Sequence, residues 1–282
     1  MKSLIVAVSL CMMVGLSSCS QPHVTYGSNP KAGHYVHVNG IELYYEIYGK
    51  GHPLVLLHGN GGSIEAFRYQ IPRFEKHYKV IAVDSRGQGK STDTEAEMTF
   101  TLMASDVAGL LDSLRIDSAY VVGWSDGAIV GLKLAQLFPS RVAKLVAIGA
   151  NFTVDTTALP EAVLKDLSIP FSALDSATQH RIISQSNFPK EAAMIYDQLR
   201  KLDLYHPKFT DEQIKSIQTP TLVMSGDHDL IKIGHTVKLF QLLPHAYLCV
   251  VPGAHHSLLQ EKPDLANEII EQFLDARFRD LK

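Results

Sequence analysis

Short apolar runs that alternate with helix-length segments constrain the fold of this chain most strongly. Four such runs occur before residue 150, at 54–57, 80–83, 120–122 and 145–148. They are rich in β-branched residues and apolar on both faces, which is typical of parallel strands buried on both sides. Between them, 101–114 and 126–138 have the length and spacing of helices, and Pro139 ends the second. We therefore predict an α/β fold with a mostly parallel, twisted sheet and helices on both faces.

A hairpin is predicted to precede these parallel strands. Residues 36–38 and 41–48 flank Asn39 and Gly40, a dipeptide that accepts the positive φ angles of a tight two-residue turn. Together with the later strands, this gives a sheet of about eight strands, a size that one large domain can hold.

The segment 151–218 has a different pattern, because it is more polar, looks helical and contains no convincing strand. Strand-like runs return at 221–224 and 247–251, with a helix around 232–242 between them and a last helix over about 262–278. We interpret 151–218 as an inserted helical cap. The predicted divisions are a signal peptide at 1–19, a tether at 20–33, core at 34–150, the cap at 151–218, and core at 219–282.

The first twenty residues resemble a bacterial lipoprotein signal. Lys2 is followed by an apolar stretch over 4–16 and then by Leu-Ser-Ser-Cys at 16–19. The stretch is short for a membrane span but suits a secretory signal peptide with small residues before the cut. The resemblance implies that Cys19 is lipidated and that the chain is anchored, outside the cytoplasm, in a bacterial cell envelope. An ordinary signal peptide and an uncleaved anchor are the alternatives.

Composition narrows the class of protein further. The chain has 282 residues, 46% of them hydrophobic, and a net charge of −3 without blocks of like charge. The hydrophobic content is that of a globular protein and excludes disorder. Because the charges are mixed along the chain, we expect no nucleic-acid partner and no polybasic membrane patch. Among three cysteines, Cys11 and Cys19 lie in the signal, so Cys249 stands alone and is predicted to be a buried structural thiol.

Ser125 is the strongest candidate for chemistry. It is the centre of Gly-Trp-Ser-Asp-Gly at 123–127, a G-x-S-x-G pattern between a predicted strand and a predicted helix. A tight turn there needs glycine on both sides and raises the serine hydroxyl above the sheet. The helix that follows points backbone N–H groups toward a developing oxyanion. The alternative is a glycine-rich turn with a helix-capping serine.

Two polar loops follow other predicted strands. His58-Gly59-Asn60-Gly61-Gly62 lets the chain approach a ligand closely, and the N–H of Asn60 would pair with that of Asp126 as an oxyanion hole. A phosphate-binding loop is disfavoured because no Gly-Lys-Ser/Thr follows. His58 is predicted to hold this loop. In the second loop, 84–91, Asp84 and Arg86 are predicted to form a structural pair that braces it.

A base and an acid follow in the second half of the core. Gly226-Asp227-His228-Asp229 and Gly253-Ala254-His255-His256-Ser257 each come after a predicted strand. A serine hydroxyl needs a base to take its proton, and the base needs a carboxylate to orient it. Ser, Asp and His occur here in the chain order of a nucleophile-elbow enzyme. A metal site at 227–229 is disfavoured, because no further ligand cluster lies nearby.

Together, these five motifs resemble those of the α/β-hydrolase fold family, over about residues 34–278. The resemblance implies Asp229 as the acid, with Asp227 as the alternative, and His256 as the base, with His255 as the alternative. The acid that some members carry after the preceding strand would fall near Asn151, which cannot serve. The elbow looks like that of serine ester hydrolases, including the valacyclovir-hydrolase-like group, and Ser125 argues against the branches that have Asp there.

The resemblance implies a serine hydrolase of small-molecule carboxylic esters or lactones that needs no metal or organic cofactor. Amidase, peptidase, carbon–carbon hydrolase and perhydrolase reactions use the same triad, and a ligand-binding protein without turnover is a further alternative. Asp126 has two interpretations, contact with a substrate amine or an acid that favours the helix N-terminus. The sequence leaves the oligomeric state and the exact substrate open.

Overall fold

A computed structural model describes residues 24–94 and 96–281. The predicted signal peptide, the lipid site at Cys19 and the first residues of the tether lie outside the described residues. Within the described ranges, no helix is both long enough and apolar enough to cross a membrane.

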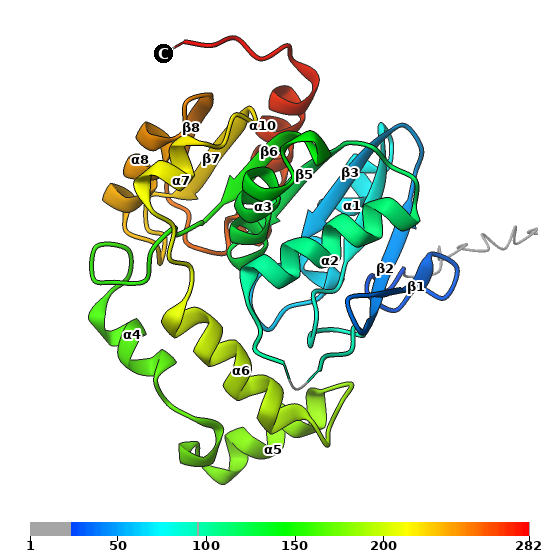
Figure 1. Cartoon of the computed structure of the whole chain (residues 1–282), viewed down its shortest axis with the longest axis vertical. Helices are drawn as coiled ribbons and strands as arrows, with labels where there is room; N and C mark the ends of the chain where they lie inside the picture. Colours follow the sequence, from blue (N-terminus) through cyan, green and yellow to red (C-terminus); the bar gives the residue numbers. More distant parts are fainter. Residues whose placement is uncertain (1–23, 95, 282) are drawn as a thin grey trace, which may run out of the picture.

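An eight-stranded sheet forms the centre of the molecule (Figure 1). Its strands are β1 Gly33–Val38, β2 Ile41–Tyr48, β3 His52–Leu57, β4 Tyr78–Val83, β5 Ala119–Trp124, β6 Val142–Ile148, β7 Thr221–Gly226 and β8 Ala246–Val251. Their order is β1-β2-β4-β3-β5-β6-β7-β8, and only the pairs β1–β2 and β2–β4 are antiparallel. The predicted fold class is therefore confirmed.

The predicted hairpin joins the two antiparallel strands at the sheet edge. Val38 pairs with Ile41, so only Asn39 and Gly40 form the turn, with φ angles of 45° and 81°. Both angles are left-handed, which is the reason that this dipeptide suits the turn.

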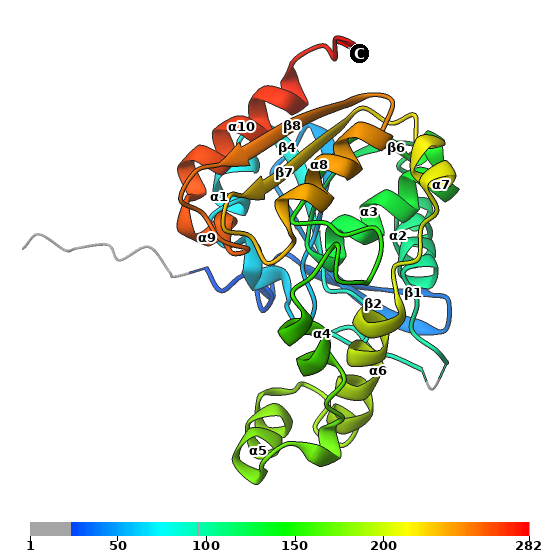
Figure 2. The same ribbon diagram turned by 90° about the vertical axis from the view of Figure 1, so that its left-hand side faces the viewer.

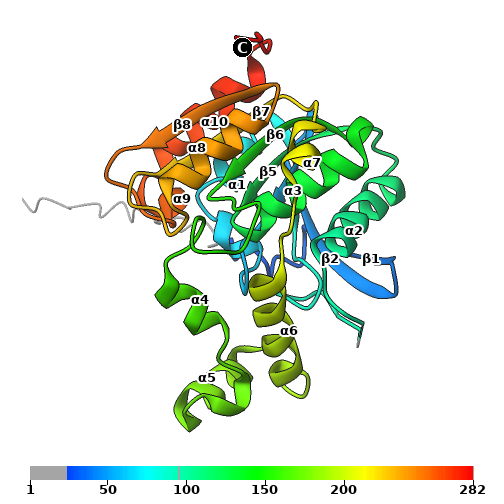
Figure 3. The ribbon, with the colours of Figure 1, turned by 60° about the vertical axis from the view of Figure 1, so that its left-hand side comes forward.

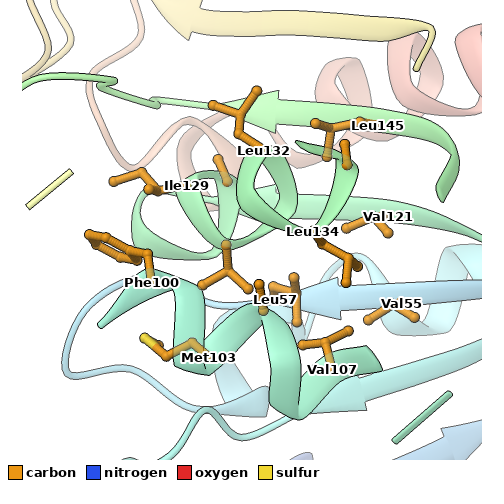
Figure 4. Close-up of a cluster of buried hydrophobic side chains, with 14 of the residues drawn as sticks. Val55, Leu57, Phe100, Met103, Val107, Val121, Ile129, Leu132, Leu134 and Leu145 are labelled. Carbon is orange, nitrogen blue, oxygen red and sulfur yellow. The ribbon is translucent and has the colours of Figure 1, made fainter. Parts of the chain in front are cut away.

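Helices cover both faces of the sheet, as Figure 2 shows. They are α1 Ile71–Phe74, α2 Phe100–Ser113, α3 Asp126–Leu137, α7 Asp211–Lys215, α8 Ile233–Leu242, α9 Leu258–Glu261 and α10 Pro263–Asp275, with short 3₁₀ turns η1 Ile64–Phe67 and η2 Pro139–Arg141. One apolar cluster fills the space between the sheet and α2, α3 and α8, and Figure 4 shows part of it. A second cluster packs α1, α9 and α10 on the opposite face. Burial on both faces explains the continuous apolar runs of the central strands.

The segment between β6 and β7 extends away from the sheet (Figure 3). It contains α4 Glu161–Leu167, η3 Phe171–Ala173, α5 Ser176–Gln185 and α6 Ala192–Tyr205. The helix α7, which lies near the end of the predicted cap segment, contacts α3 and α8 of the core instead. Where the chain leaves and re-enters the core, Phe209 N–H donates to Phe152 O over 3.0 Å. The two ends of the cap are thus held side by side.

Candidate active site

Ser125 lies in a strained turn between β5 and α3. Its φ of 56° and ψ of −121° are rare for a residue with a side chain. Both flanking glycines are required, because a Cβ on Gly123 would clash with the carbonyl oxygen of Gly127 and one on Gly127 would clash with that of Leu57. The close packing of α3 against β3 and β5 therefore forces this turn and exposes the serine hydroxyl at the end of the sheet.

His256 connects Ser125 to a buried carboxylate. Its Nε2 lies 3.0 Å from Ser125 Oγ, and its Nδ1 lies 2.7 Å from Asp229 Oδ1. The side chain of Asp229 is 1% exposed and that of His256 is 21% exposed, so the carboxylate is dry while the imidazole reaches the cavity. With Nδ1 donating to Asp229, Nε2 is free to accept the hydroxyl proton of Ser125.

The loops around His256 hold it in place. Asp229 Oδ1 also accepts from the N–H of Ile231 at 2.9 Å, and the indole N–H of Trp124 donates to His256 O at 2.8 Å. A Cβ on Gly149, at the end of β6, would lie 2.9 Å from Cε1 of His256. Gly149 was not identified from the sequence, although a glycine directly after a buried strand is the available signal.

The alternative acid and base lie elsewhere. Asp227 accepts from the N–H groups of Gly253 and Ala254 at 2.8 and 3.3 Å and pairs with His228 at 2.7 Å. The hydrogen bond from His228 lowers the pKa of Asp227. His255 pairs with Glu261 at 3.3 Å. Neither residue contacts Ser125 in the hydrogen bonds of the described chain, so the structure brings Asp229 and His256 to it instead.

The glycine-rich loop after β3 passes beside Ser125. A Cβ on Gly59 would lie 3.0 Å from Cβ of Ser125, and glycine allows this approach. His58 is buried, its Nδ1 donates to Gly59 O at 2.8 Å, and its Nε2 accepts from Ser85 N–H at 3.0 Å. Burial lowers the pKa of His58 to about 4, which keeps it neutral. The side chain thus ties the Asn60 loop to the neighbouring loop.

The second polar loop is braced differently from the prediction. Asp84 accepts from the N–H groups of Ile64 and Lys90, both at 2.8 Å, and does not pair with Arg86. Arg86 instead binds both carboxylate oxygens of Asp106 in α2, at 2.7 and 2.8 Å, and lies 3.4 Å from Asp93. The predicted Asp84–Arg86 pair is therefore wrong, because the buried guanidinium reaches a carboxylate on a helix that packs beneath the loop.

The same loop supports the oxyanion candidate. Gln88 Oε1 accepts from the N–H of Gly61 at 2.6 Å, which fixes the backbone next to Asn60. Gln88 belongs to the polar loop at 84–91, but its role was not predicted from the sequence. A bond between two irregular loops leaves no periodic pattern in the sequence that could identify it.

Asp126 occupies the first turn of α3 and is buried. Its Oδ2 accepts from the side-chain amide of Asn60 at 3.0 Å, and its carboxyl group is hydrogen-bonded to that of Asp203 in α6. Burial is the main cause that raises the pKa of Asp126 to about 6. Asp203 was not identified from the sequence, because nothing distinguishes it from other acidic residues in the cap.

A cavity of about 80 Å³ lies over these groups. Core residues and cap residues both line it, namely Ser125, Asp126, Ile129, Asn151, Leu159, Val163, Leu167, Asp203, His206, Leu230, Ile231 and His256. A serine, a base, two carboxyl groups and an otherwise largely apolar wall thus meet where the cap covers the sheet.

Two further candidates from the sequence are placed by the structure. In the described part of the chain, no three His, Cys, Asp or Glu side chains converge in a way that could hold a metal ion.

Cys249 is a free thiol but only half-buried, because β8 is an edge strand. Burial raises the pKa of this thiol, which keeps it protonated and unreactive.

Comparisons with known proteins agree with this architecture. A family model described as the alpha/beta hydrolase fold matches residues 52–210. The serine hydrolase BPHL of Mus musculus is 27% identical, over 90% of each chain. The 2-hydroxy-6-oxo-2,4-heptadienoate hydrolase of Pseudomonas putida is also 27% identical, over 88% of this chain and 98% of its own. The enol-lactonase structure from Burkholderia xenovorans LB400, 24% identical, superposes with a TM-score of 0.72 over 86% of this chain and all of its own, which shows the fold alone.

Proposed function

Because the chain belongs to the alpha/beta hydrolase fold family, we propose that it is a serine hydrolase that cleaves carboxylic esters or lactones of small molecules. One observation carries the proposal: Ser125 Oγ, the two nitrogens of His256 and Asp229 Oδ1 form a continuous hydrogen-bonded chain, with distances of 3.0 and 2.7 Å. This is the arrangement that converts a poor nucleophile into a reactive one.

In the first half of the reaction, Ser125 Oγ attacks the ester carbonyl while its proton passes to His256 Nε2. The carbonyl oxygen becomes an oxyanion that accepts hydrogen bonds from the backbone N–H groups of Asn60 and Asp126. Asp229 holds the imidazole and stabilises its positive charge. The tetrahedral intermediate then collapses, the bond to the alcohol oxygen breaks, and His256 gives its proton to that oxygen.

The second half releases the acid. Water takes the place of the alcohol and loses a proton to His256 Nε2 as its oxygen attacks the acyl-enzyme. Collapse of the second intermediate breaks the bond to Ser125 Oγ, which takes the proton back from His256. The products are the carboxylic acid and the alcohol; with a lactone, both groups remain in one molecule. Neither half needs a group from outside the chain other than water.

The test uses full-length protein in mild detergent. Wild type should hydrolyse p-nitrophenyl acetate or butyrate and react with a fluorophosphonate probe, and Ser125→Ala should lose both activities. Loss of turnover by about 10⁴-fold or more is expected for the removal of a triad nucleophile. Ser257→Ala, which changes a nearby serine outside the hydrogen-bonded chain, is the matched control and should stay labelled. Undiminished turnover in Ser125→Ala would refute the mechanism.

Carbon–carbon hydrolysis of an oxo-dienoate is the second candidate, and the name of the Pseudomonas putida relative supports it. The same serine, base and acid would serve both reactions, so the bond that is cleaved depends on what the cap admits. A panel of esters, lactones, amides and oxo-dienoates separates the candidates. Turnover of the oxo-dienoate above that of every ester would replace the leading proposal.

We also propose that the chain is anchored in a bacterial envelope by a lipid on Cys19. The sequence of residues 1–19 supports this proposal. Mass spectrometry of the mature N-terminus should find a lipidated cysteine as the first residue, and an unmodified N-terminus would contradict it.

A further inference from the structure

Two carboxyl groups face each other in the cavity beside Ser125. Asp126 belongs to the turn that carries the nucleophile, and Asp203 belongs to the last turn of α6 in the cap. Both side chains line the same cavity, a hydrogen bond joins the two carboxyl groups, and the side-chain amide of Asn60 donates to Asp126 Oδ2 at 3.0 Å. This cluster therefore connects the elbow, the glycine-rich loop and the cap.

A hydrogen bond between two carboxyl groups requires a proton, because an ionised carboxylate can only accept. One of the two carboxyl groups therefore carries a proton and donates it to the other. Burial and the charge of Asp126 together raise the pKa of Asp203 well above its ordinary value. The pair thus holds one proton and one negative charge at a pH where two exposed aspartates would both be ionised.

Other charged groups act on this pair of carboxyl groups from several elements. His256 acts on Asp126 across the cavity, and Arg200 acts on Asp203 from the preceding turn of α6. The guanidinium of Arg200 is shared with Asp166, at 3.2 Å. His206, at the end of α6, lines the same cavity and lies 3.8 Å from Glu97, and Asp229 is bonded to His256. From α4 and the segment before it, the wall is apolar, formed by Leu159, Val163 and Leu167.

We propose that Asp203 is a positioning residue that shares one proton with Asp126 and thereby ties the cap to the nucleophile elbow in the active arrangement. Loss of the shared proton leaves two like charges in contact. It removes the bond that holds α6 over the cavity and adds negative charge next to the oxyanion site. Turnover therefore falls at alkaline pH. This inference rests on the proposed function, because its kinetic consequence requires a developing oxyanion.

The first experiment is the pH dependence of kcat/KM for an uncharged ester. The kcat/KM of wild type should fall about tenfold on the alkaline side of its pH profile. This is the effect expected when one added negative charge lies about 10 Å from the developing oxyanion in a protein-like dielectric. Asp203→Asn, which donates a hydrogen bond without ionising, should lack this alkaline loss. Asp197→Asn is the matched control, because it makes the same change on α6 at a residue that bonds to Phe171 N–H instead. It should keep the wild-type profile.

The second experiment detects the proton directly. Infrared spectra of Ser125→Ala protein at neutral pH should show the carbonyl band of a protonated carboxyl group, which disappears at alkaline pH and is missing in Ser125→Ala with Asp203→Asn. This measurement needs no turnover, so it separates failure of the inference from failure of the proposed function. No band at neutral pH, or an unchanged alkaline loss in Asp203→Asn, would overturn the inference. The inference would also be overturned if the band were absent and the protein preferred ammonium-bearing esters, with this preference lost in Asp203→Asn. That result would indicate a cation subsite instead.

Discussion

Replacement of Arg86 by methionine should destabilise the protein severely. The guanidinium is 1% exposed and bonds to the carboxylates of Asp106 and Asp93, whose side chains are each 2% exposed. Methionine keeps an unbranched apolar side chain but leaves two buried negative charges without a cation. Burial already raises the pKa of both aspartates, which shows that their charge is poorly solvated even in the wild type.

The magnitude follows from the burial. Breaking a buried ion pair by removal of one partner costs about 3–5 kcal/mol in the free energy of unfolding. In a domain of this size, each kcal/mol of lost stability lowers the melting temperature by about 2–4 °C. The melting temperature of Arg86→Met should therefore fall by about 6–20 °C. The difference from wild type should shrink as the pH falls toward 5, because protonation of Asp93 and Asp106 removes the unpaired charges.

Thermal and urea unfolding, followed by circular dichroism, measure this effect. Arg73→Met is the matched control, since Arg73 makes a bidentate pair with Glu271 but is 47% exposed. An exposed ion pair contributes little to stability, so the control should lose much less melting temperature than Arg86→Met. If Arg86→Met lost no more stability than Arg73→Met, or if its loss grew as the pH fell, the reasoning from buried charge would be refuted.

Two further predictions concern the turn and the loop beside Ser125. Gly123→Ala should lower the melting temperature and abolish probe labelling, because its Cβ would meet the backbone of Gly127, whereas Gly234→Ala, with open space around it, should do neither. Wild type should have a larger free energy of unfolding than His58→Gln at pH 7, and this difference should shrink by about 3 kcal/mol as the pH falls to 4. The unfolded chain takes up a proton below about pH 6.5, while the folded protein keeps His58 neutral down to about pH 4. An advantage independent of pH in urea unfolding would contradict this.

The core of the fold could be predicted because each element carries its own pattern. The strands β3, β4, β5 and β6 are apolar on both faces, and the turn at Asn39 and Gly40 needs positive φ. The loops that carry Ser125, Asp229 and His256 follow separate strands, so the rule that sites gather at the carboxyl ends of parallel strands nominates these loops. The choice of Asp229 over Asp227 and of His256 over His255 came from the resemblance to the α/β-hydrolase family. Local patterns and one topological rule thus reach the candidate site.

Contacts between distant irregular segments could not be predicted in this way. The partner of Arg86 is Asp106, twenty residues along the chain and on another element, whereas the sequence favoured the nearer Asp84. Asp203 meets Asp126 only because α6 folds back over the sheet. Such choices depend on the packing of whole elements, and a single sequence carries no periodic signal for them.

The hydrogen bond between Phe152 and Phe209 has a consequence for how this protein can change over evolutionary time. Because the chain leaves and re-enters the core at adjacent points, the sheet requires only that these two points stay together. Insertions or deletions between them alter the length of a loop that is already closed, and each doubling of its length adds only about 0.6 kcal/mol of closure entropy. The cap can therefore be replaced as a unit, and the range of substrates can change while the sheet and the residues around Ser125 stay the same.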